Sequence, residues 1–133
     1  MKHEFAIYYA ELDTSITSIS DSEIIHRIAH VLRAEIGSHL VLFNRDLHAE
    51  IKITALSKKE MSFQVLAWHA NRFFKPFITF LLPVLKREAL EEAIYALVEL
   101  GVNSIQLVMT ERVQRKWGGQ KELERLERIA IAA

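Results

Sequence analysis

Hydrophobic and polar positions recur in short, distinct stretches along the first 70 residues. Residues 3–9 are rich in aromatic and branched side chains, which predicts a strand. Ser20 stands three residues before Glu23, a spacing typical of a capping box at the start of a helix. The helix is expected to end before Gly37. Its apolar positions recur at helical spacing: Ile24, Ile25, Ile28, Val31 and Leu32.

Three further strands are predicted in the same part of the chain. Residues 40–43 and 49–53 are apolar or alternating and flank the polar residues 44–47, which is the pattern of a hairpin. Residues 61–68 alternate well enough to form the next strand. One helix with four short strands predicts a small β-barrel across residues 1–70.

The pattern changes after residue 70. Residues 77–82 are nearly all apolar, as expected of a strand buried on both faces. A helix over 86–100, a strand over 104–109 and a helix over 120–130 follow, which predicts a parallel βαβα unit with a right-handed crossover. Two parallel strands leave both sheet edges open and cannot cover both faces. We therefore expect that further chain or another subunit completes this second domain, residues 71–133, of an α+β two-domain protein.

Composition narrows the class of protein. Half of the 133 residues are apolar and 26% are charged, which excludes disordered and low-complexity chains. No apolar stretch is long enough to span a membrane, and the first residues lack the pattern of a secretory signal. The absence of cysteine excludes disulfides and thiolate metal sites and suits the cytoplasm.

Charge is balanced overall but uneven along the chain. The 17 basic and 17 acidic residues cancel, whereas residues 112–128 hold six basic and three acidic side chains. An anionic partner is therefore expected to meet this segment.

The candidate binding residues lie mostly in that segment. They follow a predicted parallel strand, where open α/β sheets place ligand-binding loops. The candidates are Arg112, Arg115, Lys116, Trp117 and Lys121, with Arg33 at the end of the first helix. The alternative is a solvated basic loop whose Trp117 packs on the sheet, and for Arg33 a cation favoured by the helix dipole.

Two other clusters have competing interpretations. His26 and His30 share a helix face, as two metal ligands do, but no third ligand follows at a recognisable spacing, so no metal site is expected and packing against the barrel is favoured. An aromatic cluster is a candidate stacking platform, although core or interdomain packing is the stronger interpretation. Its members are Phe73, Phe74, Phe77 and Phe80.

Four segments, in order, resemble the RsmE-type family of 16S ribosomal RNA methyltransferases, which modify N3 of a uridine. Residues 26–33 read HRIAHVLR and are followed by Gly37, which is similar to the family's "H…VLR…G" pattern. Residues 99–102 read ELGV, residues 110–112 read TER, and residues 123–130 read LERLERIA, each similar to a family segment.

The resemblance implies a PUA-like, RNA-holding barrel over residues 1–70. It also implies that residues 71–133 form the first part of a SPOUT-type domain. In such domains a trefoil knot binds S-adenosylmethionine. The implied partners are 16S rRNA in the small ribosomal subunit and a second copy of the chain. Neither knot segment, "GPEGG" or "LG.RILR.ETA", occurs in these 133 residues. They are therefore expected to bind no S-adenosylmethionine and to be inactive on their own, with no catalytic residue assigned.

Two alternatives of other classes stay open. One is a stand-alone RNA-binding module, which would bind RNA in a salt-dependent way without methyl transfer. The other is a subunit whose exposed sheet edge pairs with a partner chain.

Overall fold

The computed structural model describes residues 4–133, so His3 of the first predicted strand lies outside the described residues. The chain divides into two compact units, Met1–Asn71 (unit 1) and Arg72–Ala133 (unit 2). No helix within residues 4–133 has both the length and the apolar character that a membrane span requires.

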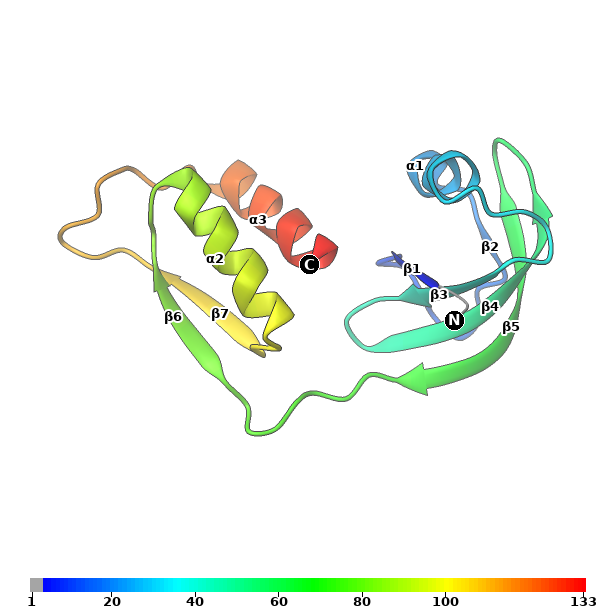
Figure 1. Ribbon diagram of the computed structural model, residues 1–133, viewed down its shortest axis with the longest axis horizontal. Coiled ribbons are helices and arrows are strands. Elements are labelled where there is room, and N and C mark those ends of the chain that lie inside the picture. Colours follow the sequence, from blue (N-terminus) through cyan, green and yellow to red (C-terminus); the bar gives the residue numbers. More distant parts are fainter. Residues whose placement is uncertain (1–3) are drawn as a thin grey trace. The chain divides into compact units, whose positions relative to one another are not determined.

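Unit 1 is built on a curled five-stranded sheet with strand order β1-β3-β4-β5-β2 (Figure 1). Strands β1 and β3 are parallel, and the remaining neighbours are antiparallel. Register shifts between β4 and β5 provide the irregularities that let a sheet bend. The strands are β1 Phe5–Tyr8, β2 Ser18–Ile19, β3 His39–Phe43, β4 Leu47–Leu56 and β5 Met61–Ala70.

The core of unit 1 follows from the alternation along its strands. In β4, Ala49, Ile51 and Ile53 are buried, while the residues between them are exposed. Helix α1, Ser22–His26, continues into a π-helical turn η1, Arg27–Val31, and adds Ile25 and Ile28 to the same core. The helix therefore covers the inner face of the curled sheet.

The start of this helix differs from the prediction, whereas its end falls before Gly37 as expected. Asp21, not Ser20, is the N-cap: its carboxylate accepts hydrogen bonds from the backbone N–H groups of Glu23 and Ile24 at 2.9 and 3.1 Å. Asp21 is one residue closer to the first turn and carries the charge that a helix N-terminus favours. The helical segment ends at Leu32, because Arg33 takes a left-handed conformation (φ 52°) well before Gly37.

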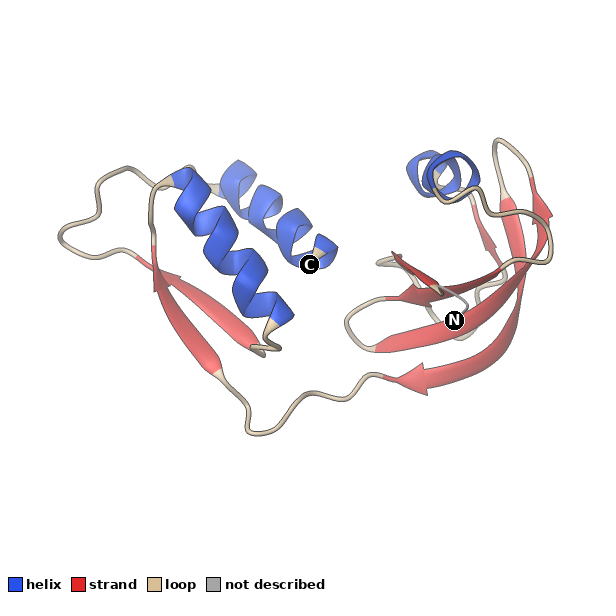
Figure 2. Cartoon of the chain, viewed as in Figure 1, coloured by secondary structure: helices blue, strands red, loops and turns tan. Residues whose placement is uncertain are grey.

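Unit 2 has the predicted strand–helix–strand–helix order and a two-stranded sheet. Strands β6 and β7 are parallel, with Thr79 opposite Ser104 and Pro83 opposite Val108. The elements are β6 Thr79–Pro83, α2 Arg87–Glu99, β7 Ser104–Val108 and α3 Gln120–Ala132. Helices α2 and α3 lie side by side against one face of this sheet (Figure 2).

The expected burial of β6 on both faces is wrong for the described chain. Leu82 is buried against α2 and α3, whereas its neighbour Leu81 on the opposite face is 60% exposed. Side chains alternate across a strand, so helices on one side bury only every second residue.

The aromatic residues before β6 are also not core residues. Phe73, Phe74 and Phe77 are all exposed, Phe74 by 73%, and Phe80 is exposed as well. Most of this cluster precedes the strand, so the side chains fall outside the layer that the helices cover. Phe73 and Phe77 instead contact each other edge to face, with ring centroids 6.3 Å apart.

Candidate nucleic-acid interface

A cavity of about 380 Å³ opens at the carboxyl ends of β6 and β7. Because the strands are parallel, the segments that follow them meet at one edge of the sheet, where α/β proteins place ligand sites. One wall comes from the connection between β6 and α2, and the other from the loop after β7. The lining residues are Pro83, Val84, Leu85, Lys86, Ala89, Thr110, Arg112, Val113 and Gln114.

The charge of this cavity is of one sign. Lys86 and Arg112 are exposed on its lining, and none of the nine lining residues is acidic. Thr110 and Gln114 add a hydroxyl and an amide that can donate or accept hydrogen bonds. Such a lining favours an anionic ligand that also carries polar edges, as a nucleotide does.

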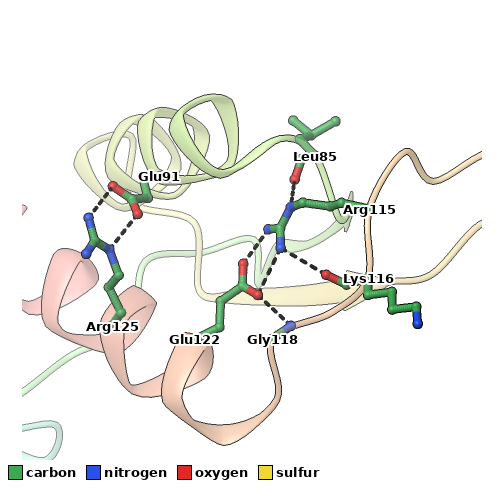
Figure 3. Close-up of polar contacts among 7 residues, drawn as sticks. All are labelled: Leu85, Glu91, Arg115, Lys116, Gly118, Glu122 and Arg125. Carbon is green, nitrogen blue, oxygen red and sulfur yellow. Dashed lines mark hydrogen bonds and ion pairs between the residues drawn. The ribbon is translucent and has the colours of Figure 1, made fainter.

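Arg115 ties the segment 110–119 (the 110–119 loop) to both neighbouring elements (Figure 3). Its Nε donates to the carbonyl oxygen of Leu85 at 2.6 Å, on the connection that forms the opposite wall of the cavity. Its Nη1 donates to Oε2 of Glu122 at 2.9 Å, and its Nη2 donates to Oε1 of the same carboxylate. Nη1 also reaches the carbonyl of Lys116 at 3.3 Å.

Glu122 is the acceptor at the centre of this arrangement. It lies in the first turn of α3, is only 7% exposed, and accepts a third hydrogen bond from the N–H of Gly118 at 2.7 Å. The Arg115 guanidinium, and then the Gly118 N–H, hold the pKa of the Glu122 carboxyl below its usual range against the opposing effect of burial. We call Arg115, Gly118 and Glu122 the loop clamp.

The loop clamp also explains why residue 118 is a glycine. A Cβ atom on Gly118 would lie 2.5 Å from Oε2 of Glu122, so any side chain there would displace the carboxylate. A second ion pair lies beside the clamp in Figure 3: Nε of Arg125 on α3 donates to Oε1 of Glu91 on α2 at 2.6 Å. This pair joins the two helices but is much more open to solvent, since Arg125 is 51% exposed.

The predicted site residues of unit 2 differ in their exposure and contacts. Arg112 and Lys116 are exposed on the 110–119 loop, and Lys121 is exposed at the start of α3. Arg115 has its donors engaged by the clamp, and Trp117 packs, half-buried, against the core of unit 2.

Arg33 lies in unit 1 and is therefore not part of this loop. It is exposed and lines a different cavity, together with Glu35 and His39.

Sequence reasoning missed Lys86 and Glu122. Lys86 lines the cavity because the β6–α2 connection lies beside the 110–119 loop. This proximity could have been predicted, because the segments that follow two parallel strands meet at the same edge of the sheet. For Glu122 the sequence signal is weak: an arginine and a glutamate seven residues apart with two glycines between them.

The histidine pair on the first helix is not packed against the barrel, so that expectation is wrong. His26 and His30 are both exposed, and their rings lie with centroids 4.7 Å apart and planes tilted by 39°. Among residues 4–133, no group of three or more acidic or histidine side chains is arranged to hold a metal ion.

Residues 74–133 match the family model described as an RNA methyltransferase domain. Among curated proteins, no sequence matches this chain.

Solved structures resemble nearly the whole chain. One is the ribosomal RNA small subunit methyltransferase E from Neisseria gonorrhoeae bound to S-adenosylmethionine, at 25% identity and a TM-score of 0.77, covering 98% of this chain and 56% of that one. Another is a probable rRNA-methyltransferase from Porphyromonas gingivalis, at 26% identity and a TM-score of 0.79, covering 94% and 52%.

A putative methyltransferase from Legionella pneumophila, in complex with S-adenosylmethionine, shares the fold at 24% identity and a TM-score of 0.75, covering 96% of this chain and 54% of that one. The chain thus spans about half the length of the solved relatives it matches.

Proposed function

From the RNA methyltransferase domain matched by residues 74–133 and the likeness to solved rRNA methyltransferases, we propose that this chain belongs to the SPOUT-type rRNA methyltransferase family and acts in S-adenosylmethionine-dependent methylation of small-subunit ribosomal RNA. The proposed target is N3 of a uridine in 16S rRNA. We propose that the protein binds this RNA in the cytoplasm during ribosome assembly. The proposed architecture is a PUA-like unit 1 over residues 1–70 and a methyltransferase unit that works as a homodimer.

The role we assign to these 133 residues is RNA binding, and the cavity beside the 110–119 loop carries the assignment. Arg112 and Lys116 project from the loop, and Lys86 stands on the opposite wall. Lysine and arginine bind phosphate oxygens and release counterions, which supplies most of the affinity for a nucleic-acid backbone. Thr110 and Gln114 offer polar groups for the edge of a base or a ribose.

The same cavity does not suit S-adenosylmethionine. That cofactor carries a positive sulfonium and an ammonium group, which favour carboxylate or carbonyl partners. The lining holds two cations and no carboxylate, so charge opposes the cofactor there. We propose that these 133 residues do not bind S-adenosylmethionine, and no step of methyl transfer is assigned to their side chains.

Two titrations test this assignment. Calorimetry of the chain with S-adenosylmethionine is expected to give no heat of binding at concentrations well above micromolar. Protein-free 16S rRNA is expected to bind the chain, and the double substitution Arg112→Ala, Lys116→Ala is expected to weaken that binding. Lys52→Ala is the matched control, because Lys52 is an exposed cation on β4 of unit 1. Equal affinity of the double variant and the control would refute the RNA site.

A second candidate is a protein-interaction unit, and one observation favours it. The face of β6 away from the helices is exposed at Leu81, and Phe77, Ile78 and Met109 beside the sheet are exposed as well. A strand from a partner chain could pair with an edge of this sheet. A stable complex that survives nuclease and high salt would support this candidate over RNA binding.

A further inference from the structure

A second cavity, of about 510 Å³, lies in unit 1 between the first helix and the turn that joins β4 to β5. It is larger than the cavity of the proposed RNA site. Its lining comes from the exposed side of the helical segment and from the end of β4. The lining residues are Ser22, Ile25, His26, Ala29, His30, Leu56, Ser57 and Lys58.

The histidine pair presents aromatic side chains at this cavity. The two rings lie with their centroids 4.7 Å apart and are tilted by 39° to each other, and both are exposed. The backbone of Arg27–Val31 is π-helical, so the turn between the rings is wider than an α-helical one. Such turns are rare and frequently mark functional sites. The rest of the lining combines apolar contacts, Ile25, Ala29 and Leu56, with the hydroxyl of Ser22, whereas the Ser57 hydroxyl is bonded within its own turn to Glu60.

The charge of its lining distinguishes this cavity from two others in unit 1. Lys58 is its one permanently charged lining residue, and no carboxylate lines it. The cavity beside Tyr8 is lined by Glu11 and Asp21, and the cavity beside Arg33 is lined by Glu4 and Glu35. Carboxylates therefore oppose a polyanion at those two cavities, in part offset by Arg33 at the second, whereas none opposes it at this one.

We propose that the cavity between His26, His30 and Lys58 takes an unpaired RNA base, with the base stacked on the exposed face of one imidazole and its phosphate beside the Lys58 ammonium. Histidine is among the side chains on which unstacked RNA bases lie, and stacking accepts any base because each has a π-face. The apolar floor suits a base, and the Ser22 hydroxyl can bond its ribose. The inference rests on the proposed RNA-binding function and gives unit 1 its own contact residues for the same substrate.

The test measures binding of a fluorescein-labelled, single-stranded oligouridylate by anisotropy. The double substitution His26→Ala, His30→Ala is expected to weaken binding about tenfold, the scale of losing one stacked base. His26→Phe, His30→Phe keeps aromatic faces and is expected to keep most of the affinity. His39→Ala is the control, since His39 is exposed on β3 outside this cavity. Circular dichroism of each variant verifies that unit 1 is folded.

The proposed contact between Lys58 and a phosphate is tested by the salt dependence of RNA binding. Lys58→Ala is expected to lower the slope of log affinity against log salt by about 0.7, the contribution of one phosphate contact in a single strand. Lys52→Ala is the control, because Lys52 is an exposed lysine on β4 that does not line the cavity. This variant is expected to leave the slope unchanged.

The outcomes separate the two proposals. If the folded histidine double-alanine variant binds as tightly as the wild type while Arg112→Ala, Lys116→Ala weakens binding, this second site is refuted and the first stands. If the phenylalanine pair loses as much affinity as the alanine pair, stacking is refuted. If the wild-type chain binds neither the oligouridylate nor 16S rRNA, the proposed function itself fails.

Discussion

Replacing Glu122 by glutamine tests whether the loop clamp holds unit 2 together. The carboxylate accepts three hydrogen bonds, two from Arg115 and one from Gly118, and the side chain is nearly buried. Glutamine keeps the shape and one acceptor oxygen, but it loses the charge and turns an N–H₂ group toward a donor. The substitution therefore removes at least one charge-assisted hydrogen bond.

The expected cost is about 2 kcal/mol of the free energy of unfolding, within the range of about 1.5–3 kcal/mol for a hydrogen bond to a charged group. The larger losses of about 3–5 kcal/mol seen when fully buried ion pairs are broken are not expected. The reason is that the Arg115 side chain is 23% exposed, so water can solvate its guanidinium when the carboxylate is gone. In a unit of this size, about 2 kcal/mol corresponds to a fall in Tm of roughly 8–16 °C.

Tryptophan fluorescence during urea unfolding provides the assay. The chain has two tryptophans, Trp68 in unit 1 and Trp117 in the loop that the clamp holds. In a Trp68→Phe background, Trp117 reports on unit 2 alone. Glu91→Gln is the matched control, because its partner Arg125 is half-exposed and exposed pairs contribute little. A Glu122→Gln midpoint no lower than that of Glu91→Gln would refute the clamp.

Three further predictions concern the same elements. Folding depresses the pKa of Glu122, so this carboxylate stabilises unit 2 fully above the ordinary glutamate pKa of about 4.3. The stabilisation is lost as pH falls through the lower folded-state pKa. Acid unfolding curves are expected to show this loss in the wild type and not in Glu122→Gln. Gly118→Ala is expected to destabilise unit 2 in the urea assay because it displaces the Glu122 carboxylate, and Gly119→Ala is expected to destabilise it through about 1–3 kcal/mol of backbone strain at φ 70°, ψ −151°. An unchanged midpoint in Gly118→Ala would contradict the placement of Gly118. Asp21→Ala is expected to destabilise unit 1 by about 1 kcal/mol through the lost N-cap, whereas Ser20→Ala is expected to have little effect, as measured by urea unfolding followed at Trp68.

The elements of unit 2 could be predicted because their patterns are long and distinct. The apolar run 77–82, the helical spacing of 86–100 and the next apolar strand fix the order, and a helix between two strands favours parallel pairing. In unit 1, β2 was not predicted. It has two residues, and Ser18 and Ile19 become a strand only through pairing with β5.

Burial was harder to predict, because it depends on which elements cover which face. Leu81 and Leu82 look alike in the sequence, yet one is exposed and the other buried, since α2 and α3 cover a single face. The exposed Phe73 and Phe74 were expected to pack in the core or between domains for the same reason: an apolar side chain does not reveal whether a partner lies opposite it.

The candidate site was predictable in place but not in detail. The basic loop after β7 follows from the sequence, whereas the separation of Arg115 from Arg112 does not. Arg115 is turned inward by Glu122 and by the Leu85 carbonyl, which only the closed loop brings together. Likewise, the spacing of His26 and His30 predicts a shared helix face, but not the π-helical turn that follows His26 and holds His30.

The salt dependence of RNA binding tests the central claim most directly. The affinity of the chain for an unmodified helical segment of 16S rRNA is measured across a series of salt concentrations, for the wild type and for Arg112→Ala, Lys116→Ala. If both side chains contact phosphates, the slope of log affinity against log salt falls by about 1.8 on the duplex scale of about 0.9 per contact. An unchanged slope would contradict RNA binding at the 110–119 loop.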